Sequence, residues 1–187
     1  MTAAWIAGTP LEVSDVDERE RAIHSGPAST ALPGHDSSEG RQLRRWLVQL
    51  MAAERIIAAE AAARNVTATR APALDELADG PGMLQLGSVA AALLAQSPLA
   101  RAMFLAVTGD IRVEPDRIKR YHDSNPELFT DRTFDEVRAE IEHTLLALAR
   151  RRAFIEWLDG RTAALVRLAP GYEHPGDPSQ PDNTHRH

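Results

Sequence analysis

The stretch from Thr133 to Gly160 constrains the fold more than any other part of the sequence. Its apolar side chains recur at steps of three and four residues, the period of one face of an α-helix: Phe134, Val137, Ile141, Leu145, Leu148, Ile155 and Leu158. We expect Thr133 to cap the first turn with Glu136 as its capping-box partner, and Gly160 to end the helix. A helix of this length spans roughly 40 Å, so it should be a spine on which the preceding shorter segments pack.

The composition indicates a helical core that is poor in large rings. The chain has 187 residues, of which 43% are hydrophobic and only 5% aromatic, with Ala and Leu dominating. This length lies within the range of a single domain. We therefore expect a mainly α fold in which helices pack closely on helices.

Several classes of protein are disfavoured by the same composition. The net charge of −6 argues against a general nucleic-acid binder, and the absence of cysteine excludes disulfides, thiolate metal sites and cysteine nucleophiles. No apolar run approaches the roughly 20 residues of a membrane span. The first residues lack the basic and apolar regions of a signal peptide, so we expect a cytoplasmic protein.

The two ends of the chain carry strand-like segments. Ala3–Ile6 and Leu11–Val13 are short and apolar, and residues 165–168 alternate in polarity. We expect residues 165–168 to pair with Ala3–Ile6 in a small two-stranded sheet that ties the ends together. Ser14 should cap a helix over residues 15–24.

The middle of the chain reads as a series of helices. The segment 25–40 is rich in Gly, Pro and Ser and is expected to be a mobile loop. Helices are expected over residues 41–65, 73–78, 83–95, 98–109 and 115–125. Glu54 falls within the apolar stripe of the first of these, and an edge position paired with an arginine is favoured there over a buried acid.

The last residues differ from the rest in composition. Residues 170–187 contain several prolines and almost nothing apolar, so they cannot fold alone. We therefore expect a helical domain over residues 1–169 and a Pro- and His-rich tail over residues 170–187.

Four stretches resemble one family in the same order along the chain. Residues 8–17 (GTPLEVSDVD) resemble the opening of the SurA-like chaperones and parvulin-type foldases, where a strand and turn lead into a helix. Residues 43–66, which include LRRWL and ERII, are similar to the second helix of that N-terminal domain. Residues 113–129 (beginning VEPDRIKRYH) resemble the segment before the isomerase domain, and residues from 134 (FDEV) resemble the helix after it.

The resemblance breaks where the family carries its catalytic domain. In the foldases a prolyl isomerase domain of roughly 90–100 residues separates the last two segments. Here only residues 130–133 lie between Phe129 and Phe134, so the isomerase residues have no counterparts in this sequence. The resemblance thus implies a SurA N-terminal-like helical domain without isomerase activity.

The resemblance leads to a first hypothesis, a chaperone-like binding module. The family's helical domain forms an apolar cradle for extended segments, and this chain would hold a protein segment or a small apolar molecule in the same way. The candidate groove residues are Trp46, Leu50, Tyr121 and Phe129. A homodimer stays open, and so does the alternative that the core consumes every apolar face.

The tail supports a second hypothesis, a metal- or histidine-dependent enzyme of a specialised biosynthetic pathway. His174, Asp177, His185 and His187 are candidate ligands for zinc, iron or copper, because imidazole and carboxylate suit these metals. In an extended chain His185 and His187 point to the same side. His122 and His143 would complete a site if the tail folded back, whereas a solvated polar terminus is the simpler interpretation.

The basic run Arg150-Arg151-Arg152 also has two interpretations. It is favoured as a solvated face near the end of a helix, and the alternative is a contact with an acidic partner or a phosphate. No glycine-rich dinucleotide motif, Walker loop or nucleophile-elbow motif is present. Motifs alone therefore assign no reaction.

Overall fold

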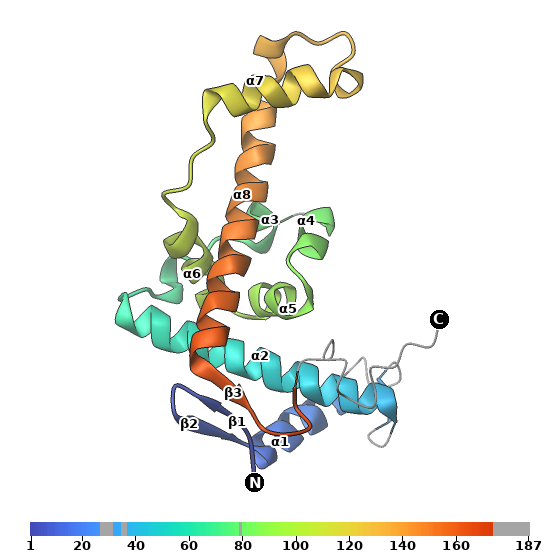
Figure 1. Ribbon diagram of the computed structural model, residues 1–187, viewed down its shortest axis with the longest axis vertical. Coiled ribbons are helices and arrows are strands. Elements are labelled where there is room, and N and C mark those ends of the chain that lie inside the picture. The colour runs from blue at the N-terminus through green and yellow to red at the C-terminus, as the bar shows by residue number, and fades with distance from the viewer. Residues whose placement is uncertain (27–31, 35–36, 79, 174–187) are drawn as a thin grey trace. The chain divides into compact units, whose positions relative to one another are not determined.

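The computed structural model describes residues 1–26, 32–34, 37–78 and 80–173, and it is mainly helical (Figure 1). Its elements, with η for 3₁₀ helices, follow in the order β1 (Thr2–Ile6), β2 (Thr9–Glu12), α1 (Val13–His24), α2 (Ser38–Ala63), η2 (Ala68–Arg70), α3 (Leu74–Leu77), α4 (Gly80–Gln85), α5 (Ser88–Gln96), α6 (Pro98–Thr108), α7 (Pro115–Ser124), η3 (Pro126–Leu128), α8 (Phe134–Leu165) and β3 (Val166–Leu168). This confirms the mainly α class and the long C-terminal helix.

The chain divides into two compact units. The first comprises residues 1–65 and 158–187, and the second comprises residues 66–157. Helix α8 belongs to both, since its first part lies in the second unit and its last part in the first. The sequence instead predicted a boundary at residue 169, between a helical body and a tail. The division into two units does not test that boundary, which stays a prediction. Part of the expected loop 25–40 lies outside the described residues.

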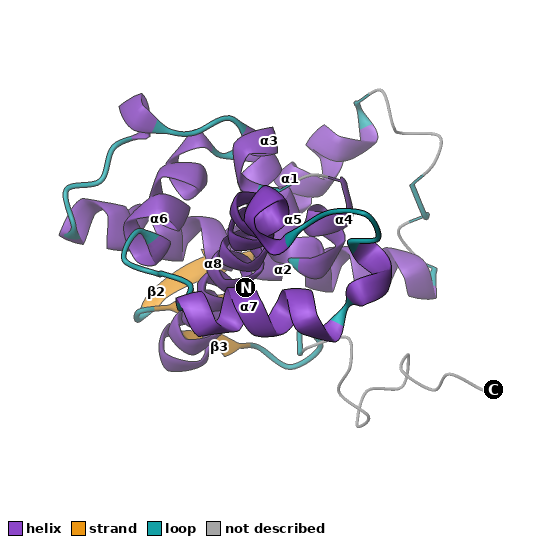
Figure 2. Ribbon diagram, turned by 90° about the horizontal axis from the view of Figure 1, so that it is seen from above, coloured by secondary structure: helices purple, strands orange, loops and turns teal. Residues whose placement is uncertain are grey.

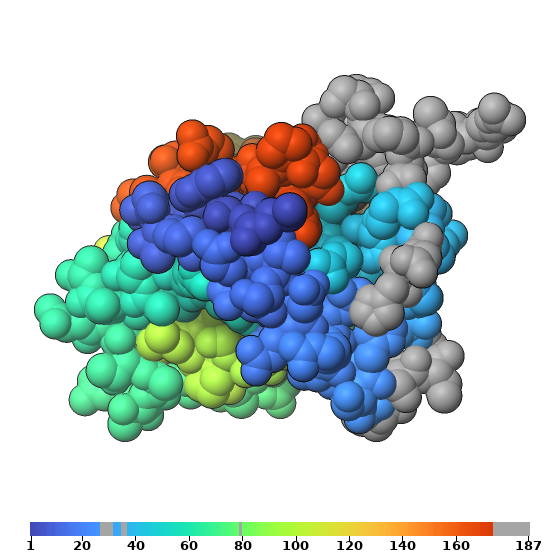
Figure 3. Space-filling model, turned by 90° about the horizontal axis from the view of Figure 1, so that it is seen from below, coloured from blue at the N-terminus to red at the C-terminus, as the bar shows by residue number. Residues whose placement is uncertain are grey.

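The strands of the first unit form one small antiparallel sheet in the order β2-β1-β3 (Figure 1). β1 pairs with β3 through Ala4↔Leu168 and Ile6↔Val166, which confirms that the two ends of the chain are joined. β2 also joins, because it returns beside β1 in a hairpin, so the expected two-stranded pairing is in fact three-stranded. Figure 3 shows the blue N-terminal strands against the orange segment that contains β3.

A two-residue turn closes the β1–β2 hairpin. Ala7 and Gly8 both have positive φ, 48° and 83°, as the tight turn between twisted strands requires. Gly8 adopts this conformation without steric cost, whereas Ala7 does not. The Ala7 amide donates to the Leu165 carbonyl at 2.8 Å, so the turn is fixed to the end of α8.

The start of α8 follows the sequence prediction, but its end does not. The Glu136 carboxylate accepts from the Thr133 amide at 2.7 Å and from the Thr133 hydroxyl at 2.8 Å, and these hydrogen bonds lower the pKa of Glu136. The prediction that Gly160 ends the helix is wrong. Gly160 is an exposed helical position, where glycine costs only modest stability, and the helix runs on to Leu165, directly before β3.

Two other predicted boundaries are corrected by local backbone chemistry. α1 begins at Val13 rather than after a Ser14 cap, and the Asp15 carboxylate accepts from the Glu12 amide at 3.3 Å. The single helix expected over residues 83–95 is two helices, α4 and α5. Gly87 lies between them with φ of 74°, a left-handed conformation that interrupts a helix.

The core of the first unit lies where the sheet, α1 and α2 meet. Side chains from all of these elements are buried: Ile6, Leu11, Val16, Leu47, Leu50, Ile56 and Ile57. Glu54 at the edge of the α2 stripe pairs with Arg19 at 2.8 Å, which confirms the expected surface pairing. Small alanines at Ala52 and Ala53 are also buried, as close helix packing requires.

The second unit has two apolar clusters along α8. In one, Phe104 of α6 lies against Phe154 of α8, with ring centroids 5.1 Å apart. In the other, α7 crosses the first part of α8 (Figures 1 and 2), and Ile118 and Phe129 pack with Val137 and Ile141. Within this unit α8 is therefore the expected spine for the segment 113–129.

No single helix among the described residues is long and apolar enough to cross a membrane. Helices α5 and α6 together have the length and apolar composition of a membrane span, but the chain bends by 114° between them.

Candidate functional site

The four predicted groove residues lie in two different units. Trp46 and Leu50 are one turn apart on α2, and Leu50 is only 1% exposed, so it belongs to the core of the first unit. Tyr121 and Phe129 are together in the second unit, with ring centroids 6.3 Å apart in an edge-on arrangement. Both belong to the cluster under α7, which places Phe129 in the core as well.

His122 and His143, the two histidines that the sequence offered to complete a metal site, have different surroundings. His122 stacks on Phe129 with centroids 5.3 Å apart and meets Phe134 edge-on, and its Nδ1 lies 3.2 Å from the Asp123 carboxylate. His143 is an exposed residue of α8. Within residues 1–26, 32–34, 37–78 and 80–173, no three His, Asp or Glu side chains gather as metal ligands. The predicted ligands His174, Asp177, His185 and His187 lie outside the described residues.

A polar junction in the first unit fastens the segment after β3 to α2. The buried Arg45 donates from Nε to the Gly171 carbonyl at 3.2 Å. The neighbouring Arg44 donates to Asp17 at 2.6 Å and to the fully buried Glu20. Burial lowers the pKa of Arg44, but hydrogen bonds to Tyr172, Asp17 and Glu20 raise it by more, so its guanidinium stays charged.

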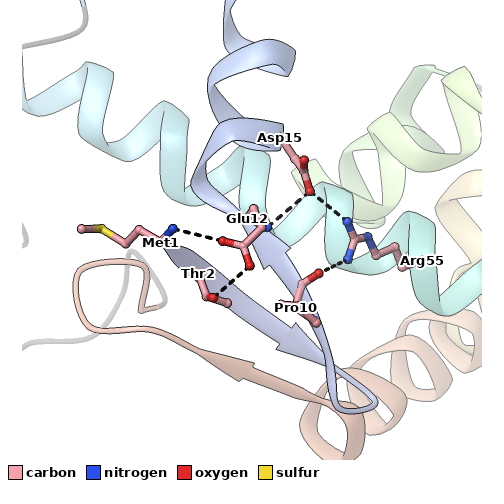
Figure 4. A network of polar contacts seen from close by, with 6 residues as sticks. All are labelled: Met1, Thr2, Pro10, Glu12, Asp15 and Arg55. Carbon is pink, nitrogen blue, oxygen red and sulfur yellow. Dashed lines mark hydrogen bonds and ion pairs between the residues drawn. The ribbon is translucent and has the colours of Figure 1, made fainter.

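A second network in this unit secures β2 (Figure 4). Arg55 of α2 donates to the Pro10 carbonyl at 2.7 Å and to Asp15 at 3.2 Å, while Glu12 accepts from the Thr2 hydroxyl. Pro10 has no amide hydrogen, and its carbonyl is occupied by Arg55, so this position of the sheet edge cannot pair with another strand. The network therefore belongs to the scaffold.

The basic run on α8 is not the solvated face that the sequence favoured. Arg152 alone is fully exposed, and it pairs with Glu156 at 2.7 Å. Arg151 is only 8% exposed, and Arg150 is half-buried with an enclosed Nε that has no partner among the described residues. Successive helical residues point about 100° apart. Since α8 is packed on several sides in the second unit, two of the three guanidiniums point inward.

A groove of about 570 Å³ runs along this part of α8 and is the largest of the hollows that we describe. Its walls combine cations, an amide and aliphatic side chains from α4, α7 and α8: Gln85, Arg117, Leu148, Ala149, Arg151, Arg152, Ala153, Ile155 and Glu156. This volume falls in the range of small-molecule sites.

Arg151 is the central polar group of this groove, which we call the Arg151 groove. Its Nε and Nη2 donate to the Gln85 side-chain oxygen at 3.2 and 3.0 Å. Gln85 is neutral, and no carboxylate pairs with Arg151 in the described parts of the chain. Burying a cation without an anion is costly, so this arrangement favours a negatively charged ligand.

A smaller pocket of about 160 Å³ lies on another side of α8. Apolar Leu77, Phe104 and Leu105 line it together with Glu76, His143 and Arg150. It adjoins a third pocket of about 170 Å³ that shares Glu76, Leu77 and His143 and reaches Arg151. Both are much smaller than the Arg151 groove, which is therefore the better candidate for holding a segment of chain.

Comparison with known proteins adds little to this geometry. Residues 2–39 match a family of unknown function (DUF7158), a stretch that covers β1, β2 and α1 but none of the Arg151 groove. No curated protein and no solved structure matches the chain.

The sequence indicated part of this site but not which residues from other helices complete it. The run Arg150-Arg151-Arg152 was visible, and an acidic partner was one of its two interpretations. Gln85 and Arg117 were missed, because they come from α4 and α7 and only the fold places them beside α8.

Proposed function

We propose that this protein is a cytoplasmic binding module that holds a segment of a partner protein and lacks prolyl isomerase activity. The observation that carries the proposal is the Arg151 groove. It combines an aliphatic wall with two guanidiniums, those of Arg117 and Arg151, that have no carboxylate partner among the described residues.

The two kinds of wall suit a polypeptide better than a purely apolar molecule. Leu148 and Ile155 are half-buried and offer aliphatic surface, while Arg117 and Arg151 offer hydrogen-bond donors. A peptide segment presents both apolar side chains and acceptors, and helix-lined grooves are a recurrent site for such segments.

The resemblance to the SurA-like chaperones supports the same function. In that family the helical domain cradles extended segments, and the part of this chain that resembles it includes residues 113–129 and the start of α8. Arg117 belongs to the first of these stretches. The groove that we propose thus draws on a region for which the resemblance implies binding.

Selection from a library of displayed random peptides tests the proposal. The intact protein should enrich peptides that then bind in solution, and a variant that fills the groove, Ala153→Leu, should weaken this binding several-fold by occupying space. Ala139→Leu is the matched control, since Ala139 is an exposed position of α8 outside the groove. The proposal fails if no peptide is enriched, or if both substitutions leave binding unchanged.

A further inference from the structure

We infer that the Arg151 groove selects acidic segments, and that Arg151 receives the carboxylate of an Asp or Glu side chain of the partner. This inference rests on the proposed function and adds the chemical class of the segment. It starts from the hydrogen bonding of one buried guanidinium.

Arg151 has donors left over after its contacts within the protein. An arginine side chain carries five N–H donors, and within the described residues Arg151 donates only from Nε and Nη2, both to the same oxygen of Gln85. Its Nη1 makes no hydrogen bond with the described residues. A carboxylate that enters the groove would accept from the remaining N–H donors of the guanidinium, which is a strong, charge-assisted interaction.

The electrostatics of the groove favour an anion beyond this single contact. Three arginines line it and only one acid, Glu156, which already pairs with Arg152. Arg117 is exposed on α7 and has no ion pair within the part of the chain that is described. Arg117 and Arg151 therefore leave a local positive charge in a protein whose net charge is −6.

The aliphatic wall argues for a protein segment rather than a small inorganic anion. Leu148, Ala149, Ala153 and Ile155 line the same groove as the two arginines. A phosphate ion would leave most of the 570 Å³ and all of this apolar surface unused. An acidic side chain next to Leu, Ile or Val in the same segment satisfies both walls, and this is the sequence signature that we expect.

The experiment begins with the peptides that the random library yields. We expect them to contain Asp or Glu beside an aliphatic residue. One enriched peptide is synthesised with acetylated and amidated ends, so that only side chains carry charge, and its Glu→Gln counterpart is the comparison. Loss of one charge-assisted contact should weaken binding about 10-fold or more.

Protein variants locate the carboxylate. Arg151→Gln should weaken the acidic peptide about 10-fold, and it should abolish the difference between the Glu and Gln peptides, because the two changes remove the same contact. Arg117→Gln should weaken binding about 2- to 5-fold, as is usual for an exposed charge, and Arg120→Gln should not. Arg117 and Arg120 are both exposed on α7, but only Arg117 lines the groove.

The outcomes separate this inference from the proposed function. If the enriched peptides are neutral or basic, the preference for acidic segments is wrong but segment binding stands. If no peptide is enriched, both proposals are wrong. Equal effects of Arg117→Gln and Arg120→Gln also overturn it, and this pair decides the matter even if Arg151→Gln fails to fold. Displacement of the peptide by inorganic phosphate, at an ionic strength matched with chloride, would show an anion site without segment recognition and contradict the inference.

Discussion

Arg44 in the first unit and Arg151 in the second unit have different kinds of partner. In the first unit, arginines bridge elements to carboxylates: Arg44 reaches Asp17 and Glu20, Arg19 reaches Glu54, and Arg55 reaches Asp15. In the second unit, the buried Arg151 hydrogen-bonds, among the described residues, only to the neutral amide of Gln85. We therefore assign Arg44 to the scaffold and Arg151 to a place for a ligand.

The contrast matters because substituting the two kinds of arginine should change the free energy of unfolding in opposite directions. Removing one member of a buried pair strands the other charge, while removing an unpaired buried cation relieves a desolvation cost. Stability measurements on matched substitutions can therefore break or sharpen the comparison.

The largest effect is expected at Arg44. Arg44→Met removes a hydrogen-bonded cation from the fully buried Glu20 carboxylate, and the free energy of unfolding should fall by about 2–4 kcal/mol. Urea denaturation measures the change. Arg21→Met, at an exposed position of α1, is the control and should have little effect. If Arg44→Met lowers the free energy of unfolding no more than Arg21→Met does, Arg44 is not part of the scaffold.

Arg151→Met should have the opposite sign. Methionine fills a similar space without a charge, and Gln85 is exposed and can bind water instead, so the free energy of unfolding should rise by about 1 kcal/mol. The same urea titration checks it. A fall as large as that at Arg44 would mean that Arg151 is part of the scaffold, and the two arginines would not differ.

Gly160 tests whether α8 continues into the first unit. Because Gly160 is exposed in the helix and has open space around it, Gly160→Ala should raise the free energy of unfolding by about 0.5–1 kcal/mol. Gly8→Ala is the contrasting variant, since Gly8 has a φ of +83° and alanine there is strained. If Gly160→Ala destabilised the protein, the helix would end where the sequence first suggested.

The smallest effect concerns Glu136 at the start of α8. Hydrogen bonds from the Thr133 amide and hydroxyl hold the pKa of Glu136 below its ordinary value, so its contribution to stability is present above the ordinary pKa and is lost as the pH falls through the folded pKa. Carbon-13 NMR of the carboxyl should show a titration midpoint below that in an unfolded peptide of the same sequence. A midpoint at or above the peptide value would contradict the capping geometry.

Local patterns in the sequence predicted much of the scaffold. The apolar period of Val137, Ile141 and Leu145 located α8, and the Thr133–Glu136 spacing located its first turn, since both depend on residues within a few positions. Gly160 misled because glycine weakens a helix only modestly at an exposed position, and the residues beyond it continue the helix.

The candidate site was less predictable because it depends on tertiary packing. Leu50 and Phe129 were predicted as groove residues, but the structure buries them in the cores of different units. The arginine run was noticed, but its burial follows from the packing around α8. The side-chain partner of Arg151 comes from position 85, far along the chain, and no local pattern joins the two.

The most direct test follows the side-chain Nε–H signals of the arginines by nitrogen-15 NMR while an enriched acidic peptide is added. We predict that the Arg151 signal shifts in proportion to binding, and that the Arg44 signal, from the paired network of the first unit, stays in place. A peptide that binds and moves the Arg44 signal while leaving the Arg151 signal unchanged would contradict the assignment of Arg151 to ligand binding.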